Sequence, residues 1–345
     1  MAGQARGWFP PLDSIGPVIE QNPLGQLSSR RWRWGAGLAV GLVALLVLAG
    51  CGGGGDETAP RAPAASGPAG AAMPPPQTNC AQRATDLASF QRVSASATAG
   101  NTICVTGDLR GEPLEITTGG TQQAPITFLG DGKTVTSGIN VSANNVVVDG
   151  FVAEEPEAPG VALEGSNITL RNTTINSPRE GDGDGIRFWG NNIKILHNTI
   201  TDTSNDTGAH ADCMQTYATD ENNPASQDVL IDSNRCEQID NNCLIAEGPN
   251  SSAGDGSGEG ETKNITFSNN FCDNQAAQAV LADDVRNMVI TGNQIVGQIN
   301  HAFAFQNEST SGVVSNNQVR SVKYEVGMDS SSEKGYQGPA AGGGP

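Results

Sequence analysis

The chain has 345 residues, with 37 acidic against 19 basic side chains, a formal net charge of −18, 44 glycines and only 5% aromatic residues. This acidity argues against nucleic acid as a partner, because phosphate binding needs a basic surface. It also disfavours a polyanionic ligand unless a metal ion or a local basic patch offsets the field. The glycine content favours tight turns and short strands over long helices.

Residues 1–50 are predicted to be a signal peptide. Three arginines, Arg30, Arg31 and Arg33, precede an apolar run from Ala36 to Gly50, which is short for a membrane span but suits a signal-peptide core. The run ends in Leu48-Ala49-Gly50-Cys51, which resembles the lipobox of bacterial lipoprotein signals. This resemblance implies lipidation at Cys51 and a membrane-anchored protein on the extracytoplasmic face. The alternative is a cleaved signal or short anchor in which Cys51 is incidental.

The segment 51–79 is rich in Gly, Ala and Pro and contains almost no large apolar side chains, so it is predicted to be a flexible tether. Residues 80–328 form the predicted folded domain. The segment 329–345 consists largely of small and polar residues and is predicted to be a disordered tail.

A short pattern recurs along the domain every 22 to 36 residues. Two apolar residues alternate, an Asn often follows three places later, and another apolar residue comes two places after that. Alternation predicts strands with one buried face, and a repeat of this size predicts a solenoid. The Asn column can hydrogen-bond the backbone of the next turn. Its clearest copies are Ile193, Ile195, Asn198, Ile200; Val229, Ile231, Asn234, Cys236; Ile265, Phe267, Asn270, Cys272; and Met288, Ile290, Asn293, Ile295.

A second strand in each turn also aligns, with Ile186, Met214, Leu244, Val280 and Phe303 expected to point inward. At this point the chain resembles pectate-lyase-like β-helix proteins over roughly residues 85–325. The resemblance implies an all-β fold, a single-stranded right-handed parallel β-helix, whose N-terminal end is covered by a short amphipathic helix near 86–91. Activity does not follow, because this architecture serves lyases, hydrolases, epimerases and inert adhesins.

Six cysteines follow Cys51, and disulfides persist in an exported chain. Cys213 and Cys243 share one column of the repeat, and Cys236 and Cys272 share another. Strands on successive turns lie about 4.8 Å apart, within the Cα range of a disulfide. We therefore predict Cys213–Cys243 and Cys236–Cys272, with Cys80–Cys104 fastening the cap. A metal cluster or a catalytic thiol is the alternative.

Acidic residues gather in the turn that precedes the second strand. Asp182, His210 and Asp240 align in one column, and Asp184, Asp212 and Asn242 align in the next. Carboxylates this close repel one another unless a cation lies among them, and oxygen ligands suit Ca²⁺. Asp182, Asp184, Asp212 and Asp240 are therefore candidate calcium ligands. The alternative is that Asp and Asn simply populate turns.

Arg187 points outward two residues beyond this column. In pectate-lyase-like lyases, Ca²⁺ binds the uronate and acidifies the carbon-bound proton while an Arg or Lys acts as base, so the resemblance makes Arg187 the candidate base. In the alternative, Arg187 only neutralises the neighbouring aspartates. Gln215 completes a His210-x-Asp212-x-x-Gln215 pattern found in several β-helix families, which adds His210 and Gln215 as candidate catalytic residues.

The same outward face continues through Trp189, Tyr217, Glu247, Asp283 and Gln306. Trp189 and Tyr217 are candidate sugar-stacking residues. Glu247 and Asp283 lie on adjacent turns, close to the carboxylate separation of about 5 Å in retaining glycosidases. The alternative for both acids is a solvated strand face.

The protein is expected to be an extracytoplasmic monomer that meets a polysaccharide or cell-envelope glycan, and three functions stay open for it. The first is a calcium-assisted uronan lyase with Arg187 as base. The second is a glycoside hydrolase that uses Glu247 and Asp283. The third is a non-catalytic glycan-binding module of the cell surface.

Overall fold

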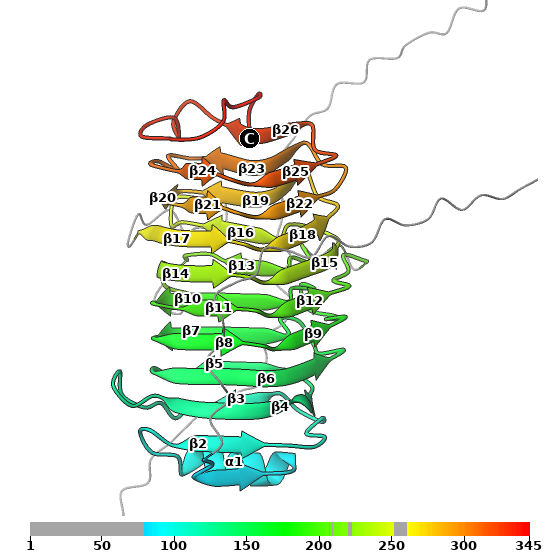
Figure 1. The fold of residues 1–345 in the computed structure, drawn as a ribbon, viewed down its shortest axis with the longest axis vertical. Coiled ribbons are helices and arrows are strands. Elements are labelled where there is room, and N and C mark those ends of the chain that lie inside the picture. Colours follow the sequence, from blue (N-terminus) through cyan, green and yellow to red (C-terminus); the bar gives the residue numbers. More distant parts are fainter. Residues whose placement is uncertain (1–78, 207, 209, 220–222, 252–260) are drawn as a thin grey trace, which may run out of the picture. The chain divides into compact units, whose positions relative to one another are not determined.

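The computed structural model describes residues 79–345 except 207, 209, 220–222 and 252–260, and the predicted lipidation site Cys51 lies outside these residues. The described residues wind into a pectate-lyase-like right-handed parallel β-helix whose coils stack in chain order from α1 to β26 (Figure 1). The predicted fold class is confirmed. Within these residues, no helix is both long and apolar enough to span a membrane.

The strands form three parallel stacks, one for each face of the coil. The first stack contains β1 (Gln82–Ala84), β2 (Thr102–Val105), β4 (Ile126–Thr136), β6 (Val146–Glu154), β8 (Ile168–Arg171), β11 (Lys194–Leu196), β14 (Gln227–Asp232), β17 (Thr262–Ser268), β21 (Val289–Thr291) and β24 (Val313–Ser315). The two-residue β20 (Val285–Arg286) also pairs with β17.

The second stack begins with the C-terminal halves of β4 and β6. It continues through β9 (Thr174–Asn176), β12 (Thr199–Thr201), β15 (Arg235–Ile239), β18 (Phe271–Asn274), β22 (Gln294–Val296) and β25 (Gln318–Arg320).

The third stack carries most of the predicted functional residues. It contains β3 (Leu114–Ile116), β5 (Ile139–Ser142), β7 (Val161–Ser166), β10 (Ile186–Asn191), β13 (Met214–Thr216), β16 (Leu244–Glu247), β19 (Gln278–Asp283), β23 (His301–Gln306) and β26 (Tyr324–Met328). Alternate residues of all three stacks point inward, so one apolar core runs along the helix.

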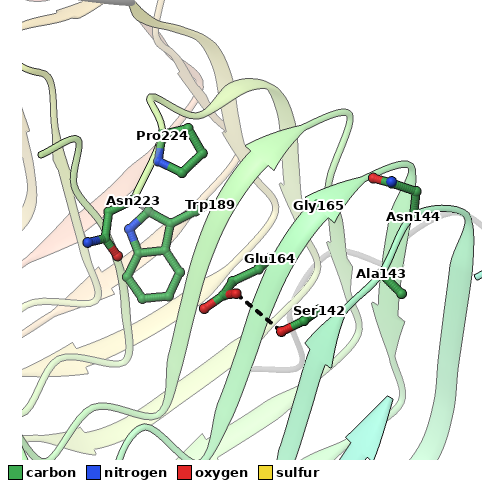
Figure 2. A pocket seen from close by; sticks show the side chains of 8 residues that line it. All are labelled: Ser142, Ala143, Asn144, Glu164, Gly165, Trp189, Asn223 and Pro224. Carbon is green, nitrogen blue, oxygen red and sulfur yellow. Dashed lines mark hydrogen bonds between the residues drawn. The ribbon is translucent and has the colours of Figure 1, made fainter. Parts of the chain in front are cut away.

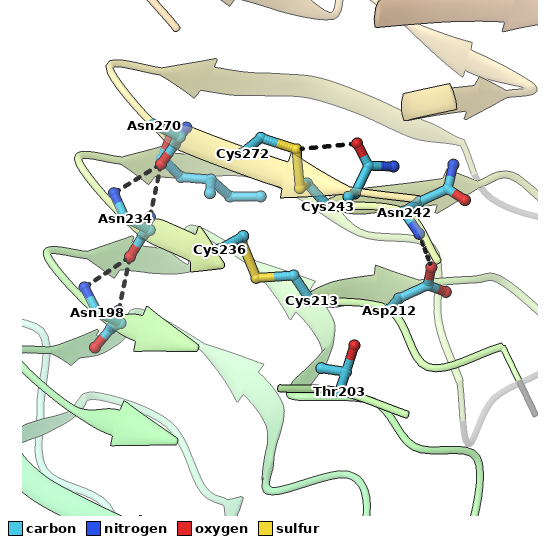
Figure 3. The surroundings of a disulfide bond; sticks show 12 residues. Asn198, Thr203, Asp212, Cys213, Asn234, Cys236, Asn242, Cys243, Asn270 and Cys272 are labelled. Atoms are coloured by element: carbon cyan, nitrogen blue, oxygen red, sulfur yellow. Dashed lines mark hydrogen bonds between the residues drawn. A yellow bond between two sulfur atoms is a disulfide. The ribbon is translucent and has the colours of Figure 1, made fainter. Parts of the chain in front are cut away.

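A buried asparagine ladder marks the turn between the first and second stacks. The side-chain amides of Asn198, Asn234, Asn270, Asn293 and Asn317 bond one to the next at 3.0–3.1 Å (Figure 3 shows the first three). Each amide also bonds to backbone groups of a neighbouring coil. The residue before each ladder position has a positive φ, as at Asn269 (55°), and Asn tolerates this conformation. The predicted role of the Asn column is confirmed.

The N-terminal end of the core is covered by α1 (Leu87–Ala95), as the resemblance implied. Asp86 caps α1 by accepting a hydrogen bond from the backbone N–H of Ser89 at 2.7 Å, and the Ser89 side chain bonds back to the Asp86 N–H. The ring of Phe90 packs on Phe128, with centroids 5.5 Å apart. The helix therefore closes one open end of the stack.

Two of the three predicted disulfides are wrong. Cys80–Cys104 is present, but the other bonds are Cys213–Cys236 and Cys243–Cys272 (Figure 3). The predicted columns are correct, since Cys236 pairs in register with Cys272. Inward side chains of neighbouring parallel strands project side by side, whereas side chains from opposite faces of one coil meet in the core. The Cys213–Cys236 and Cys243–Cys272 bonds therefore each cross a single coil instead of joining two coils.

The C-terminal segment 329–345 differs from the disordered tail that we expected. Gln337 donates a backbone hydrogen bond to Gly312 and accepts one from Val314, and the ring of Tyr336 packs against Phe305. Further on, Gly342 donates to the carbonyl of Val326 in β26. Composition suggested disorder, but these contacts with the last coils order the segment.

Candidate functional site

The candidate site lies on the outward face of the third stack, around β10, β13, β16 and β19. Register places Arg187 of β10 beside Gln215 of β13, Glu247 of β16 beside Asp283 of β19, and Asp283 beside Gln306 of β23. The predicted columns are thus brought together as vertical neighbours about 4.8 Å apart.

Arg187 is the centre of an ion-pair cluster. Its Nε donates to Asp184 Oδ2 at 2.8 Å and to Gln215 Oε1 at 3.1 Å, and its Nη2 contacts Asp182 Oδ2. The guanidinium also lies over the ring of Tyr217, 5.4 Å from its centroid. Burial alone would lower the pKa of Arg187, but Asp184 and Asp182 together keep that pKa above its usual value.

Asp184 is fully buried beneath this arginine. The pKa of Asp184 is raised to about 7, mainly by burial and also by the Asp182 charge, while Arg187 opposes the increase. Asp184 Oδ1 also accepts a hydrogen bond from the backbone N–H of Asp212 at 2.8 Å. This carboxylate therefore links the arginine to the next coil.

Asp212 is equally buried, and its burial raises its pKa well above the usual value, with Asp184 adding to the effect. Its Oδ1 accepts hydrogen bonds from the side chain of Asn241 at 2.9 Å and from the backbone of Asn242 at 2.8 Å. Its Oδ2 has no partner among the described residues. Asn241 and Asn242 were not predicted to bind Asp212, although their place in the repeat beside that residue was visible in the sequence.

The residues predicted to bind calcium do not fit a metal site. Asp182 and Asp184 bond to Arg187, Asp212 bonds to asparagine, and Asp240 accepts from the backbone N–H of Asn205 at 3.1 Å. In the described part of the chain, no three His, Cys, Asp or Glu side chains are grouped to hold a metal ion. The cation that offsets the repulsion between Asp182 and Asp184 is Arg187 itself. His210, predicted in the same column, is exposed.

Glu247 and Asp283 have different surroundings although they are adjacent. The pKa of Glu247 is raised to about 7, mainly by burial and also by the Asp283 charge, while a hydrogen bond from Gln215 opposes the increase. Asp283 accepts from Gln306 Nε2 at 2.8 Å and from Asn307 Nδ2 at 2.6 Å, so both of its oxygens are held. Glu247 remains 7% exposed and Asp283 only 1%.

The two predicted sugar-stacking rings contact each other. Trp189 and Tyr217 meet edge to face with centroids 5.3 Å apart, and Trp189 is only 5% exposed. Trp189 therefore cannot offer an open ring face to a sugar in this conformation, whereas Tyr217 is partly exposed beside Arg187. Burial raises the pKa of the Tyr217 phenol, so it stays protonated at neutral pH.

No protein family model matches the chain, and no curated protein matches it. Solved structures share its fold. A mannuronic-acid-specific polysaccharide lyase of family 6 from the human gut microbiota is 14% identical, with a TM-score of 0.53 over 70% of this chain and 59% of its own. A variant of an alginate lyase of the same family is 13% identical, with a TM-score of 0.50 over 73% of this chain and 40% of its own.

A third structure, a family 6 polysaccharide lyase from Pseudopedobacter saltans, is 16% identical, with a TM-score of 0.49 over 70% of this chain and 64% of its own. The chain thus spans less than two thirds of all three proteins. At these identities the likeness concerns the fold.

Proposed function

We propose that the protein is an exported carbohydrate-active enzyme, a polysaccharide lyase that cleaves uronate-containing chains by β-elimination. One observation carries the proposal. On a fold shared with polysaccharide lyases, a positioned cation, Arg187, and a carboxyl group with a pKa of about 7, Glu247, lie on the same strand face. A base works best when its pKa lies near the working pH.

Arg187 is better suited to hold a substrate carboxylate than to act as the base predicted from the resemblance. Asp182 and Asp184 favour its charged form, and a base must be uncharged. Its Nε and Nη2 are occupied by Gln215 and the two aspartates, which leaves Nη1 for a uronate carboxylate. Neutralising that carboxylate would acidify the proton on the adjacent carbon.

Glu247 and Tyr217 then supply the proton transfers. The Glu247 carboxylate removes the C5 proton, and the released electron pair forms the C4–C5 double bond. The bond between C4 and its glycosidic oxygen breaks, and the leaving oxygen takes the proton of the Tyr217 phenol. The products are an unsaturated uronide and a new chain end. No step passes through calcium, because the acidic residues that were expected to bind it do not fit a metal site.

Hydrolysis by Glu247 and Asp283 is less well supported. A retaining hydrolase needs both carboxylates to face the sugar. Asp283 is 1% exposed, and amide donors hold both of its oxygens. Of the two carboxylates, Glu247 is therefore the better candidate to meet a substrate.

Export and anchoring belong to the same proposal. Three disulfides support an oxidising compartment. Lipid attachment at Cys51 would then hold the enzyme on the extracytoplasmic face, where polysaccharide or cell-envelope glycan is its partner.

The test is a cleavage assay on pectate, alginate, hyaluronan and a neutral galactan. New ultraviolet absorbance from an unsaturated uronide is expected, and it should be lost in Glu247→Gln and Arg187→Ala but kept in Glu154→Gln, an exposed control. Reducing ends without this absorbance, lost in Asp283→Asn, would instead indicate the hydrolase. Glycan binding without any cleavage would indicate a non-catalytic module.

A further inference from the structure

A pocket of about 590 Å³ opens on the same strand face, beside the candidate site (Figure 2). Ser142, Glu164 and Trp189 line it from three successive strands, β5, β7 and β10, on which they are register partners. Figure 2 shows Glu164 and Ser142 on one side of the indole and Asn223 and Pro224 on the other.

The pocket continues the column that leads to Glu247. From Glu164 the column runs through Trp189 and Tyr217 to Glu247, which is three strand spacings, or about 14 Å. A polysaccharide that lies along the helix axis would therefore have one sugar at Arg187 and Glu247 and another, a few units away, in the pocket.

The surroundings of this column differ in charge along its length. Arg187 lies on β10, two residues before Trp189, and its guanidinium lies over Tyr217, the column residue next to Glu247. By contrast, no Lys, Arg or His is among the residues that line the pocket. Instead, Glu164 exposes a carboxylate that accepts a hydrogen bond from Ser142 Oγ at 3.1 Å. A second uronate would be repelled here, but sugar hydroxyl groups can donate to the carboxylate.

The remaining wall suits an uncharged sugar. Asn144 and Asn223 contribute side-chain amides, and Ala143 and Pro224 contribute apolar surface. The indole N–H of Trp189, in the same wall, is buried and has no acceptor among the described residues. A buried donor without an acceptor is costly, so its presence here is a second sign of a built polar site.

We propose that this pocket is a subsite for an uncharged pyranose, a hexose or an N-acetylhexosamine. Together with the proposed lyase function, on which this assignment rests, the pocket indicates the substrate class. That class is a polysaccharide in which uronates alternate with neutral sugars. A chain made of uronates alone would place a carboxylate against Glu164, in a protein that already carries a net charge of −18.

Binding is the test, measured by calorimetry on full-length protein carrying Glu247→Gln so that no turnover occurs. The probes are oligosaccharides of hyaluronan, which alternate glucuronate with N-acetylglucosamine, oligomannuronates of equal length, and neutral oligomers of glucose or of N-acetylglucosamine. We expect the hyaluronan oligomers to bind at least about tenfold more tightly than the oligomannuronates, which corresponds to about 1.4 kcal/mol. The relative affinities of the two neutral oligomers show whether the pocket prefers a hexose or an N-acetylhexosamine.

Two variants locate the binding. Ser142→Tyr should fill the pocket and weaken hyaluronan binding about tenfold, while Thr169→Tyr on β8, outside the pocket, should not. Glu164→Gln should bind oligomannuronates more tightly, so the difference in affinity between hyaluronan oligomers and oligomannuronates should become smaller. Equal affinity for both probes, no binding of any probe, or normal binding by Ser142→Tyr would overturn the subsite. The ultraviolet assay decides the lyase function separately, since the subsite can bind sugar in a protein that cleaves nothing.

Discussion

Replacing Arg187 with leucine should destabilise the fold, because Arg187 balances a buried charge. Leucine keeps part of the aliphatic volume but removes the ion pairs to Asp182 and Asp184 and the hydrogen bond to Gln215. The arginine side chain is 17% exposed and that of Asp184 is 0% exposed. Removing one partner of such a buried pair costs about 3–5 kcal/mol of unfolding free energy.

The loss should depend on pH in a defined direction. The pKa of Asp184 is raised from 3.8 to about 7 in the folded protein, so the folded state binds this proton more tightly than the unfolded state does. Ionisation of Asp184 therefore removes stability as the pH rises from about 4 to about 7. In Arg187→Leu, the Asp184 carboxyl group needs no cationic partner at about pH 5, because it is protonated there. At about pH 8 the same group is ionised and would be a buried charge without a partner. The destabilisation by Arg187→Leu should be larger at the higher pH.

The assay is urea unfolding followed by circular dichroism at both pH values with the disulfides intact. Arg179→Leu is the control, because its partner Asp202 and Arg179 itself are 53% and 42% exposed and such a pair is worth about 1 kcal/mol or less. Adding Asp184→Asn to Arg187→Leu should recover part of the loss. An equal loss at both pH values, or no recovery in the double variant, would refute this electrostatic reasoning.

Four further outcomes are expected. Asn234→Ala should lower the free energy of unfolding in urea by about 3–5 kcal/mol, because it leaves buried backbone groups unpaired. Asn317→Ala, at the less buried end of the ladder, should lower it clearly less, and equal losses would contradict this prediction. Replacing Cys213 and Cys236 together with serine should lower stability by about 3 kcal/mol, and an unchanged urea midpoint would count against the bond. On a polysaccharide that the enzyme cleaves, kcat should rise as the pH passes through about 7, because Glu247 then ionises. A kcat that does not change with pH would exclude Glu247 as the base. EDTA should leave Tm unchanged, and a fall in Tm that calcium reverses would point to a metal site.

The sequence predicts what depends on periodicity. Inward residues such as Ile195 and Ile231, and the amides of Asn198 and Asn234, recur at the same step of each coil, so their stacking follows from the spacing alone. The cysteine columns follow in the same way. The partner of Cys213 does not, because spacing says which residues lie above one another but not which side chains meet across the core.

The site is less predictable for the same reason. Spacing brings Glu247 beside Asp283 and Arg187 beside Gln215. It does not reveal that Asn307, outside the repeat pattern, donates a hydrogen bond to Asp283. Nor does it reveal that Arg187 forms ion pairs with Asp182 and Asp184. Glu164 could have been found by extending the Trp189 column one coil towards the N-terminus, where register places it.

The last residues of the chain have a consequence for how neighbouring molecules behave when they are crowded together. A parallel β-helix exposes unpaired peptide groups at each end, and such an edge can recruit a further strand. Helix α1 lies over the first coil, and the bonds from Gly342 to Val326 and from Met328 to Gly343 use donors and acceptors of the final strand. These contacts cover the first coil and part of the last one, so fewer free peptide groups remain there to pair with a strand of a neighbouring copy.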